Sequence, residues 1–167
     1  EKVICDTIKL DCSNCPCAPF DEPSGTGNWF VQNGNFSLST PGPSNLPGDA
    51  YLQTTDGQGP TWLINSVDYS GNWGQQYLGK CICWDYRIFD DSSPGTLVTN
   101  PQIWIFGPGI SAKFIATNVS VSENSGWVHV CAPIGPCVGG NLPSNAMGSW
   151  QWVTGGTGTI CNPNWNT

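Results

Sequence analysis

The run from Lys80 to Phe89 constrains the fold more than any other segment of this chain. Every second position in it carries a large apolar side chain, namely Ile82, Trp84, Tyr86 and Ile88. Successive side chains of a β-strand point to opposite faces, so this alternation predicts a half-buried strand with that set turned toward the core. Asp85 and Arg87 then belong to the outer face, together with the cysteines at positions 81 and 83.

Shorter strand-like segments recur along the chain and are separated by loops rich in glycine and proline. They span residues 28–38 (with a bend at Asn33 and Gly34), 50–54, 62–64, 102–106, 113–117, 126–132 and 149–153. No window has the period of a long amphipathic helix. The pattern predicts an all-β protein, and we expect an antiparallel β-sandwich of jelly-roll type.

Nine cysteines in 167 residues predict a disulfide-bonded protein from an oxidising compartment, secreted or at the cell surface. They are Cys5, Cys12, Cys15, Cys17, Cys81, Cys83, Cys131, Cys137 and Cys161. The odd number leaves one thiol over or one partner outside the chain. A zinc site built from the first cluster and the pair at 81 and 83 is the less favoured alternative, because two regular C-x-x-C knuckles are missing and there is one histidine.

The disulfide connectivity stays open at this stage. Cys81 and Cys83 lie on one strand face at roughly 6–7 Å between Cα atoms, which is awkward for a bond between them. We therefore expect each to bond a different neighbour, and Cys131 falls on the matching face of a candidate neighbouring strand. Cys137 and Cys161 flank the C-terminal segment and are candidates to staple it.

Charge and composition narrow the range of partners. Only 10% of residues are charged, and the net charge of −7 argues against nucleic acid, anionic membrane surfaces and acidic polymers. No apolar stretch approaches the roughly 18 residues of a membrane span. Abundant Asn, Ser and Trp favour a neutral polyhydroxylated ligand. Asn35 and Asn118 begin N-glycosylation sequons, which agrees with secretion.

A longer pattern surrounds the central strand. Residues 51–62 contain Trp62, a loop over 69–74 contains Trp73, and the strand at 80–89 follows. Further on come the segment 101–107, a Trp at position 127 and a Pro at 133. This order resembles the laminin-B (laminin IV) type of extracellular β-sandwich module, which is similar to jelly-roll carbohydrate-binding modules. The resemblance covers roughly residues 20–160 and implies recognition or adhesion.

The chain departs from that family at both ends. We expect residues 1–19 to form a cysteine-rich extension outside the module and residues 20–167 to form the β-sandwich, without an obvious last strand. An open sheet edge invites an added strand. The alternating segment 3–10 is a candidate filler, either from the same subunit or from a neighbour.

A candidate ligand site follows if the strands at 80–89, 102–106 and 126–132 share one sheet. Their non-core face would then gather Asp85, Arg87, Gln102, Trp104 and His129. An aromatic ring stacks on the C–H surface of a sugar while polar side chains bind its hydroxyls. Trp73 is a second candidate for ligand contact, and packing in the core is its alternative.

The sequence offers little support for catalysis. The single His129 has no nucleophile motif near it, and the acidic pairs are adjacent in sequence, which makes no glycosidase dyad. Asp21 and Glu22 are candidate oxygen ligands for a structural Ca²⁺ ion.

We therefore expect a non-enzymatic module that binds neutral glycans or mediates adhesion to a cell-surface or matrix partner. One alternative is a structural subunit of an extracellular filament, assembled by strand exchange or disulfides. Another is an accessory module of a polysaccharide-degrading enzyme.

Overall fold

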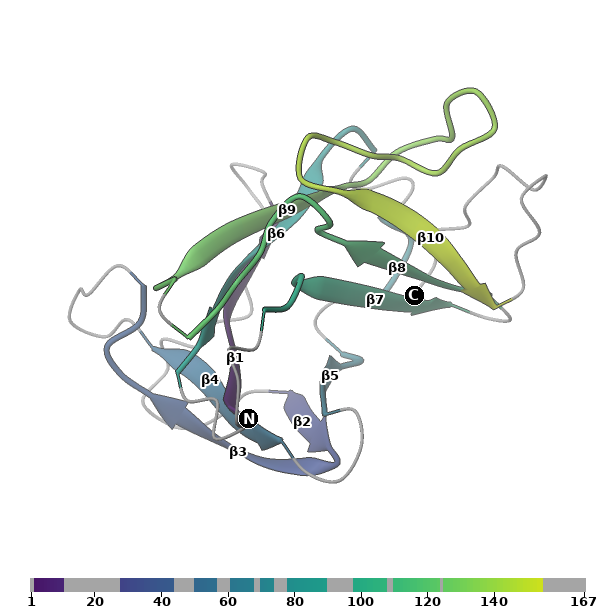
Figure 1. The fold of residues 1–167 in the computed structure, drawn as a ribbon. Coiled ribbons are helices and arrows are strands. Elements are labelled where there is room, and N and C mark those ends of the chain that lie inside the picture. The colour runs from purple at the N-terminus through teal and green to yellow at the C-terminus, as the bar shows by residue number, and fades with distance from the viewer. Residues whose placement is uncertain are drawn as a thin grey trace.

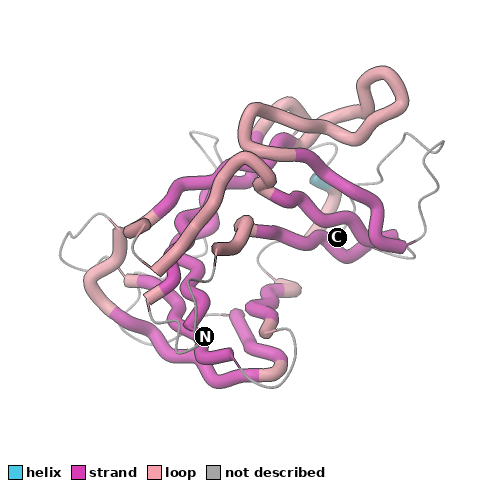
Figure 2. Tube along the Cα trace, in the orientation of Figure 1, coloured by secondary structure: helices cyan, strands magenta, loops and turns pink. Residues whose placement is uncertain are grey.

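The protein is built from antiparallel β-strands. The computed structural model describes residues 2–10, 28–43, 50–56, 61–67, 70–73, 78–89, 98–107, 110–123 and 125–154. Strands dominate this part of the chain (Figure 2). They are β1 (Lys2–Leu10), β2 (Trp29–Gln32), β3 (Gly34–Ser39), β4 (Tyr51–Asp56), β5 (Trp62–Asn65), β6 (Cys81–Ile88), β7 (Gln102–Gly107), β8 (Ile110–Ile115), β9 (Val128–Pro133) and β10 (Ser149–Thr154).

The strands form three sheets (Figure 1). The order in the five-stranded sheet is β3-β4-β1-β6-β9, and the order in the three-stranded sheet is β10-β8-β7. A two-stranded sheet joins β2 to β5. Every ladder is antiparallel, which confirms the predicted all-β antiparallel class. The jelly-roll connectivity stays a prediction.

The two larger sheets share one hydrophobic core. Phe114 of β8 is 0% exposed and meets Trp84 of β6 edge to face, with ring centroids 6.4 Å apart. The same phenyl ring meets Trp150 of β10 at 5.7 Å. The Trp150 indole nitrogen also donates a 2.7 Å hydrogen bond to the Pro133 carbonyl of β9. Phe114 and Trp150 therefore tie the three-stranded sheet to the five-stranded sheet.

Alternation in β6 decides which side chains reach this core. Ile82, Trp84, Tyr86 and Ile88 are all buried, as predicted. Asp85 and Arg87 on the opposite face are partly exposed. The predicted bend at Asn33 and Gly34 is also confirmed, because Asn33 has φ 61° and separates β2 from β3. Asparagine tolerates this left-handed conformation better than most residues.

The N-terminal segment forms a central strand of the larger sheet. β1 pairs with β4 through Val3 and Thr54 and with β6 through Val3 and Ile88. Sequence reasoning placed this segment at a sheet edge, either in its own subunit or in a neighbour. In the structure β1 pairs on both sides with strands of its own chain. The cysteines at 12, 15 and 17, together with Asp21 and Glu22, lie outside the described residues.

Candidate functional site

The predicted ligand face divides between two sheets. β6 and β9 are neighbours in the five-stranded sheet, so Asp85, Arg87 and His129 share its outer face. β7 pairs with β8 in the three-stranded sheet and carries Gln102 and Trp104 there. The condition on which the predicted site depended, that all three strands share one sheet, is therefore not met. Alternation shows which side chains share a face of one strand, but long-range pairing decides which strands are neighbours.

Two neighbouring cross-strand pairs lie together on the outer face of β6 and β9. We call these four side chains the disulfide quartet: Cys83, Cys131, Asp85 and His129. Cys83 lies directly opposite Cys131, and Asp85 lies directly opposite His129. Cys83 and Cys131 form a disulfide across the two strands, with Cα atoms 4.1 Å apart. The prediction that the strand of Cys131 lies beside the strand of Cys81 and Cys83 is thereby confirmed. The expectation that each of these two cysteines bonds a neighbour holds for Cys83, whereas Cys81 keeps its thiol and lies opposite Pro133.

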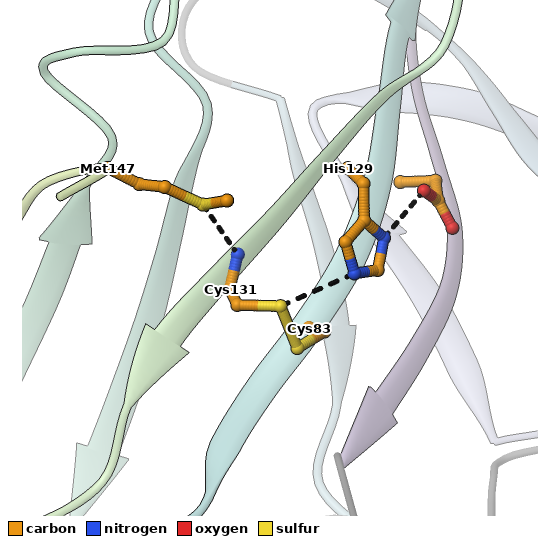
Figure 3. Close-up of polar contacts among 5 residues, drawn as sticks. Cys83, His129, Cys131 and Met147 are labelled. Carbon is orange, nitrogen blue, oxygen red and sulfur yellow. Dashed lines mark hydrogen bonds and ion pairs between the residues drawn. A yellow bond between two sulfur atoms is a disulfide. The ribbon is translucent and has the colours of Figure 1, made fainter. Parts of the chain in front are cut away.

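His129 connects the two halves of the quartet (Figure 3). Its Nδ1 lies 2.9 Å from Oδ1 of Asp85, and its Nε2 lies 3.3 Å from Sγ of Cys131. A carboxylate only accepts hydrogen bonds, so Nδ1 carries the proton that the Asp85 carboxylate accepts. The side chains of His129 and Asp85 are 57% and 20% exposed, so solvent reaches this pair.

The backbone around the quartet is also fixed. The Cys131 amide donates to Sδ of Met147 at 3.3 Å, as Figure 3 shows, and its carbonyl accepts a 2.8 Å bond from the Asn145 amide. Cys137 also forms a disulfide. Whether Cys137 and Cys161 staple the C-terminal segment stays open, because position 161 lies outside the described part of the chain.

Arg87 lies on the same strand face as Asp85 but contacts an aromatic group. Its guanidinium carbon is 4.2 Å from the centroid of the Phe89 ring, a cation–π distance. Phe89 stacks on Tyr51 at 5.3 Å and meets Trp127 edge to face at 5.8 Å. Arg87 is therefore held against rings of the five-stranded sheet.

A second aromatic group, the aromatic platform, consists of Trp62, Trp104 and Phe106. Trp62 of β5 meets Trp104 of β7 at 4.6 Å between ring centroids, with the rings nearly perpendicular. Trp104 and Phe106 lie nearly parallel at 6.0 Å, because two residues along a strand share a face. Phe106 is 57% exposed although it is a large hydrophobic side chain.

Polar side chains continue the platform across the sheet. Trp104 lies directly opposite Lys113 of β8, and Lys113 lies directly opposite Gln151 of β10. The Lys113 ammonium is 5.2 Å from the centroid of the Trp104 ring. Gln151 is exposed, as is Gln102 on the same face of β7. One row therefore presents an aromatic ring, a cation and an amide side by side.

Sequence reasoning missed Trp62, Lys113 and Gln151 as site residues. Lys113 stands between the core residues Ala112 and Phe114, and Gln151 stands between Trp150 and Trp152. A single polar side chain between two apolar ones in a strand signals an outward position. That signal was present in the sequence, but nothing in the sequence showed that β8 and β10 are neighbours in one sheet.

The remaining predicted site residues have different fates. Trp73 is 3% exposed and belongs to the core cluster, so its ring has no open face for a ligand. Packing, the alternative for this residue, is what the structure has. Asn35 and Asn118 are both exposed, and the Asn118 amide donates to the Ala146 carbonyl at 2.9 Å. Glycosylation at either site stays a prediction, as does calcium binding by Asp21 and Glu22.

Comparisons with known proteins do not place the chain in a family. No family model matches it, and neither a curated protein nor a solved structure does. The resemblance to laminin-B modules therefore stays a prediction. Among the described residues, no helix is both long and apolar enough to cross a membrane.

Proposed function

We propose that this chain is a non-catalytic, secreted module that binds neutral glycans on the aromatic platform. The observation that carries the proposal is the exposed Phe106 beside Trp104, in a row with Lys113 and Gln151. Exposed aromatic side chains grouped on a folded surface mark a binding site more often than an accident of packing. Rings that stack on the C–H face of a sugar need hydrogen-bonding side chains beside them, and this row supplies them.

The chemistry of the row favours a sugar over an apolar partner. Lys113 is a donor only, whereas the amides of Gln151 and Gln102 both donate and accept. This combination matches hydroxyl groups, which also donate and accept. The net charge of −7 disfavours sulfated and carboxylated chains, so a neutral glycan fits best.

The platform also favours an extended chain over a single sugar. Trp104 and Phe106 follow one another along β7, and Lys113 and Gln151 lead across to β10. Contacts distributed over three strands suit several consecutive sugar units. The ladders of the surrounding strands fix the backbone of these residues, so binding has to order only their side chains.

Retention on an array of neutral, sulfated and carboxylated glycans tests the proposal. The wild-type chain is expected to bind neutral glycans, and Trp104→Ala or Phe106→Ala to weaken binding by about tenfold to thirtyfold. Phe89→Ala is the matched control, because it removes a partly buried ring from the other sheet and should leave binding unchanged. Loss of binding in Phe89→Ala with full binding in Trp104→Ala would place the ligand on the five-stranded sheet and contradict the platform.

A further inference from the structure

The disulfide quartet contains three atoms that suit a soft metal ion. Sγ of Cys83, Sγ of Cys131 and a ring nitrogen of His129 all lie within 4.8 Å of one another. While the two sulfurs are bonded to each other they are poor ligands, because metal ligation needs thiolates. The ability of the quartet to bind a metal ion therefore depends on the oxidation state of the disulfide.

We propose that reduction of the Cys83–Cys131 disulfide converts the quartet into a three-ligand Zn²⁺ site. A dithiol supplies the reducing equivalents: its own sulfurs join as a disulfide, the Cys83–Cys131 bond breaks, and each Sγ receives one proton. Zinc binding then displaces these two protons, because the ligands are thiolates. Two Cys and one His with an open fourth position form a known zinc ligand set.

The spacing of the backbone fits that geometry. In a tetrahedral site with Zn–S bonds of about 2.3 Å, two sulfurs lie about 3.8 Å apart. The Cα atoms of Cys83 and Cys131 are 4.1 Å apart on one face, so thiolates projecting side by side lie near that separation. The same geometry puts sulfur and nitrogen about 3.6 Å apart, and Sγ of Cys131 is already 3.3 Å from Nε2. Rotation of the two cysteine side chains is the main change required.

Asp85 prepares His129 for this role. Its carboxylate accepts the Nδ1 proton at 2.9 Å, which leaves Nε2 as the ligand atom on the side of the sulfurs. A carboxylate behind a ligating histidine fixes the ring and its tautomer in many zinc sites. Solvent reaches the quartet through the exposed His129 ring, so a water molecule or a small ligand can take the fourth position.

The test measures zinc and cobalt binding to the full chain before and after reduction with a phosphine, which leaves no competing thiol. Wild-type protein in the reduced state is expected to bind one more zinc ion than the Cys83→Ser/Cys131→Ser variant. In the oxidised state the two should bind the same amount. Co²⁺ should give thiolate charge-transfer absorption that the double variant lacks.

Three further variants separate a built site from general binding by a cysteine-rich chain. Asp85→Asn should weaken the additional zinc site by about tenfold to a hundredfold. His129→Ala keeps the disulfide, so it folds as the oxidised protein does, and should weaken the site more than Asp85→Asn does. Cys81→Ser removes a thiol from the same strand face outside the three-atom group and should leave the additional zinc ion bound.

Equal zinc content in the reduced wild type and the double variant would overturn the proposal. Wild-type zinc affinity in His129→Ala would overturn it too, because the thiols alone would then explain binding. Circular dichroism of the reduced protein completes the test: loss of the β-sheet spectrum on reduction would mean that the folded chain holds no such site.

Discussion

The outer faces of the two larger sheets are assembled in the same way but from different side chains. On the five-stranded sheet, Cys83 faces Cys131 and Asp85 faces His129, so a covalent bond and a hydrogen bond cross between β6 and β9. On the three-stranded sheet, Trp104 faces Lys113, which faces Gln151. On the first face, Asp85, His129 and the disulfide contact one another, whereas the second face presents rings and donors to solvent. This difference is why we assign redox and metal chemistry to one face and ligand binding to the other.

Both sheets pack on the same core. The largest loss of stability is expected from removing the side chain that packs between them. Phe114→Ala should lower the free energy of unfolding by about 3–5 kcal/mol, because its ring is fully buried between Trp84 and Trp150. Urea denaturation measures this. Phe106→Ala is the matched control, since its ring is 57% exposed and its removal should change stability by about 0.5 kcal/mol or less. Equal losses in the two variants would mean that the platform is part of the core.

Removal of the disulfide should lower the stability of the chain without changing glycan binding on the other sheet. Cys83→Ser/Cys131→Ser should lower the free energy of unfolding by about 2–4 kcal/mol, because the bond closes a long loop in the unfolded chain. At temperatures where the variant is folded, glycan binding by the platform should persist at wild-type affinity. The measurement pairs thermal unfolding with glycan retention, and loss of binding by the folded variant would show that the two faces depend on each other.

A substitution just before β10 should destabilise the three-stranded sheet and weaken glycan binding on its outer face. A Cβ atom added at Gly148 runs into the backbone of Ile115 and Ala116, so Gly148→Ala forces β10 away from β8. Overpacking of this kind costs about 1–3 kcal/mol, and it should also weaken glycan binding by displacing Gln151 from Lys113. Gly135→Ala serves as the control, because an added Cβ there meets nothing within 4 Å. Thermal unfolding and glycan retention of the two variants test this contrast.

The smallest stability effect is expected at the hydrogen bond between Asp85 and His129. Asp85→Asn should change the free energy of unfolding by less than about 1 kcal/mol, because His129 is 57% exposed and water screens the pair. The same substitution should have a large effect on zinc binding by the reduced chain. A stability loss as large as that of the disulfide variant would show that the pair is structural, which would weaken its assignment as a positioning group for zinc.

The sequence predicted individual strands and their faces well. Period-two alternation identified the buried face of β6, and the same rule placed Asp85, Trp104 and His129 on outer faces. Alternation reports burial of each strand by itself, so these predictions needed no tertiary information.

The alternation of side chains along a strand does not predict which strands pair with each other. β7 and β9 have similar patterns, yet β9 joins β6 while β7 joins β8. Trp73 illustrates the same limit, since a tryptophan in a glycine-rich loop has the same local sequence whether it packs or binds. The contact between Trp62 and Trp104 joins strands of different sheets, and no local pattern encodes it.

The interior position of β1 has a consequence for the synthesis of this protein. Val3 is made well before Ile88, so one of its two partner strands is incomplete until Ile88 has been added. At roughly 5–20 residues per second, that interval lasts several seconds. During it, one edge of β1 has no partner strand from its own chain, and nascent β-structure with open edges is prone to aggregation. Production of the folded chain should therefore depend on how the cell shields residues 2–10 until β6 is complete.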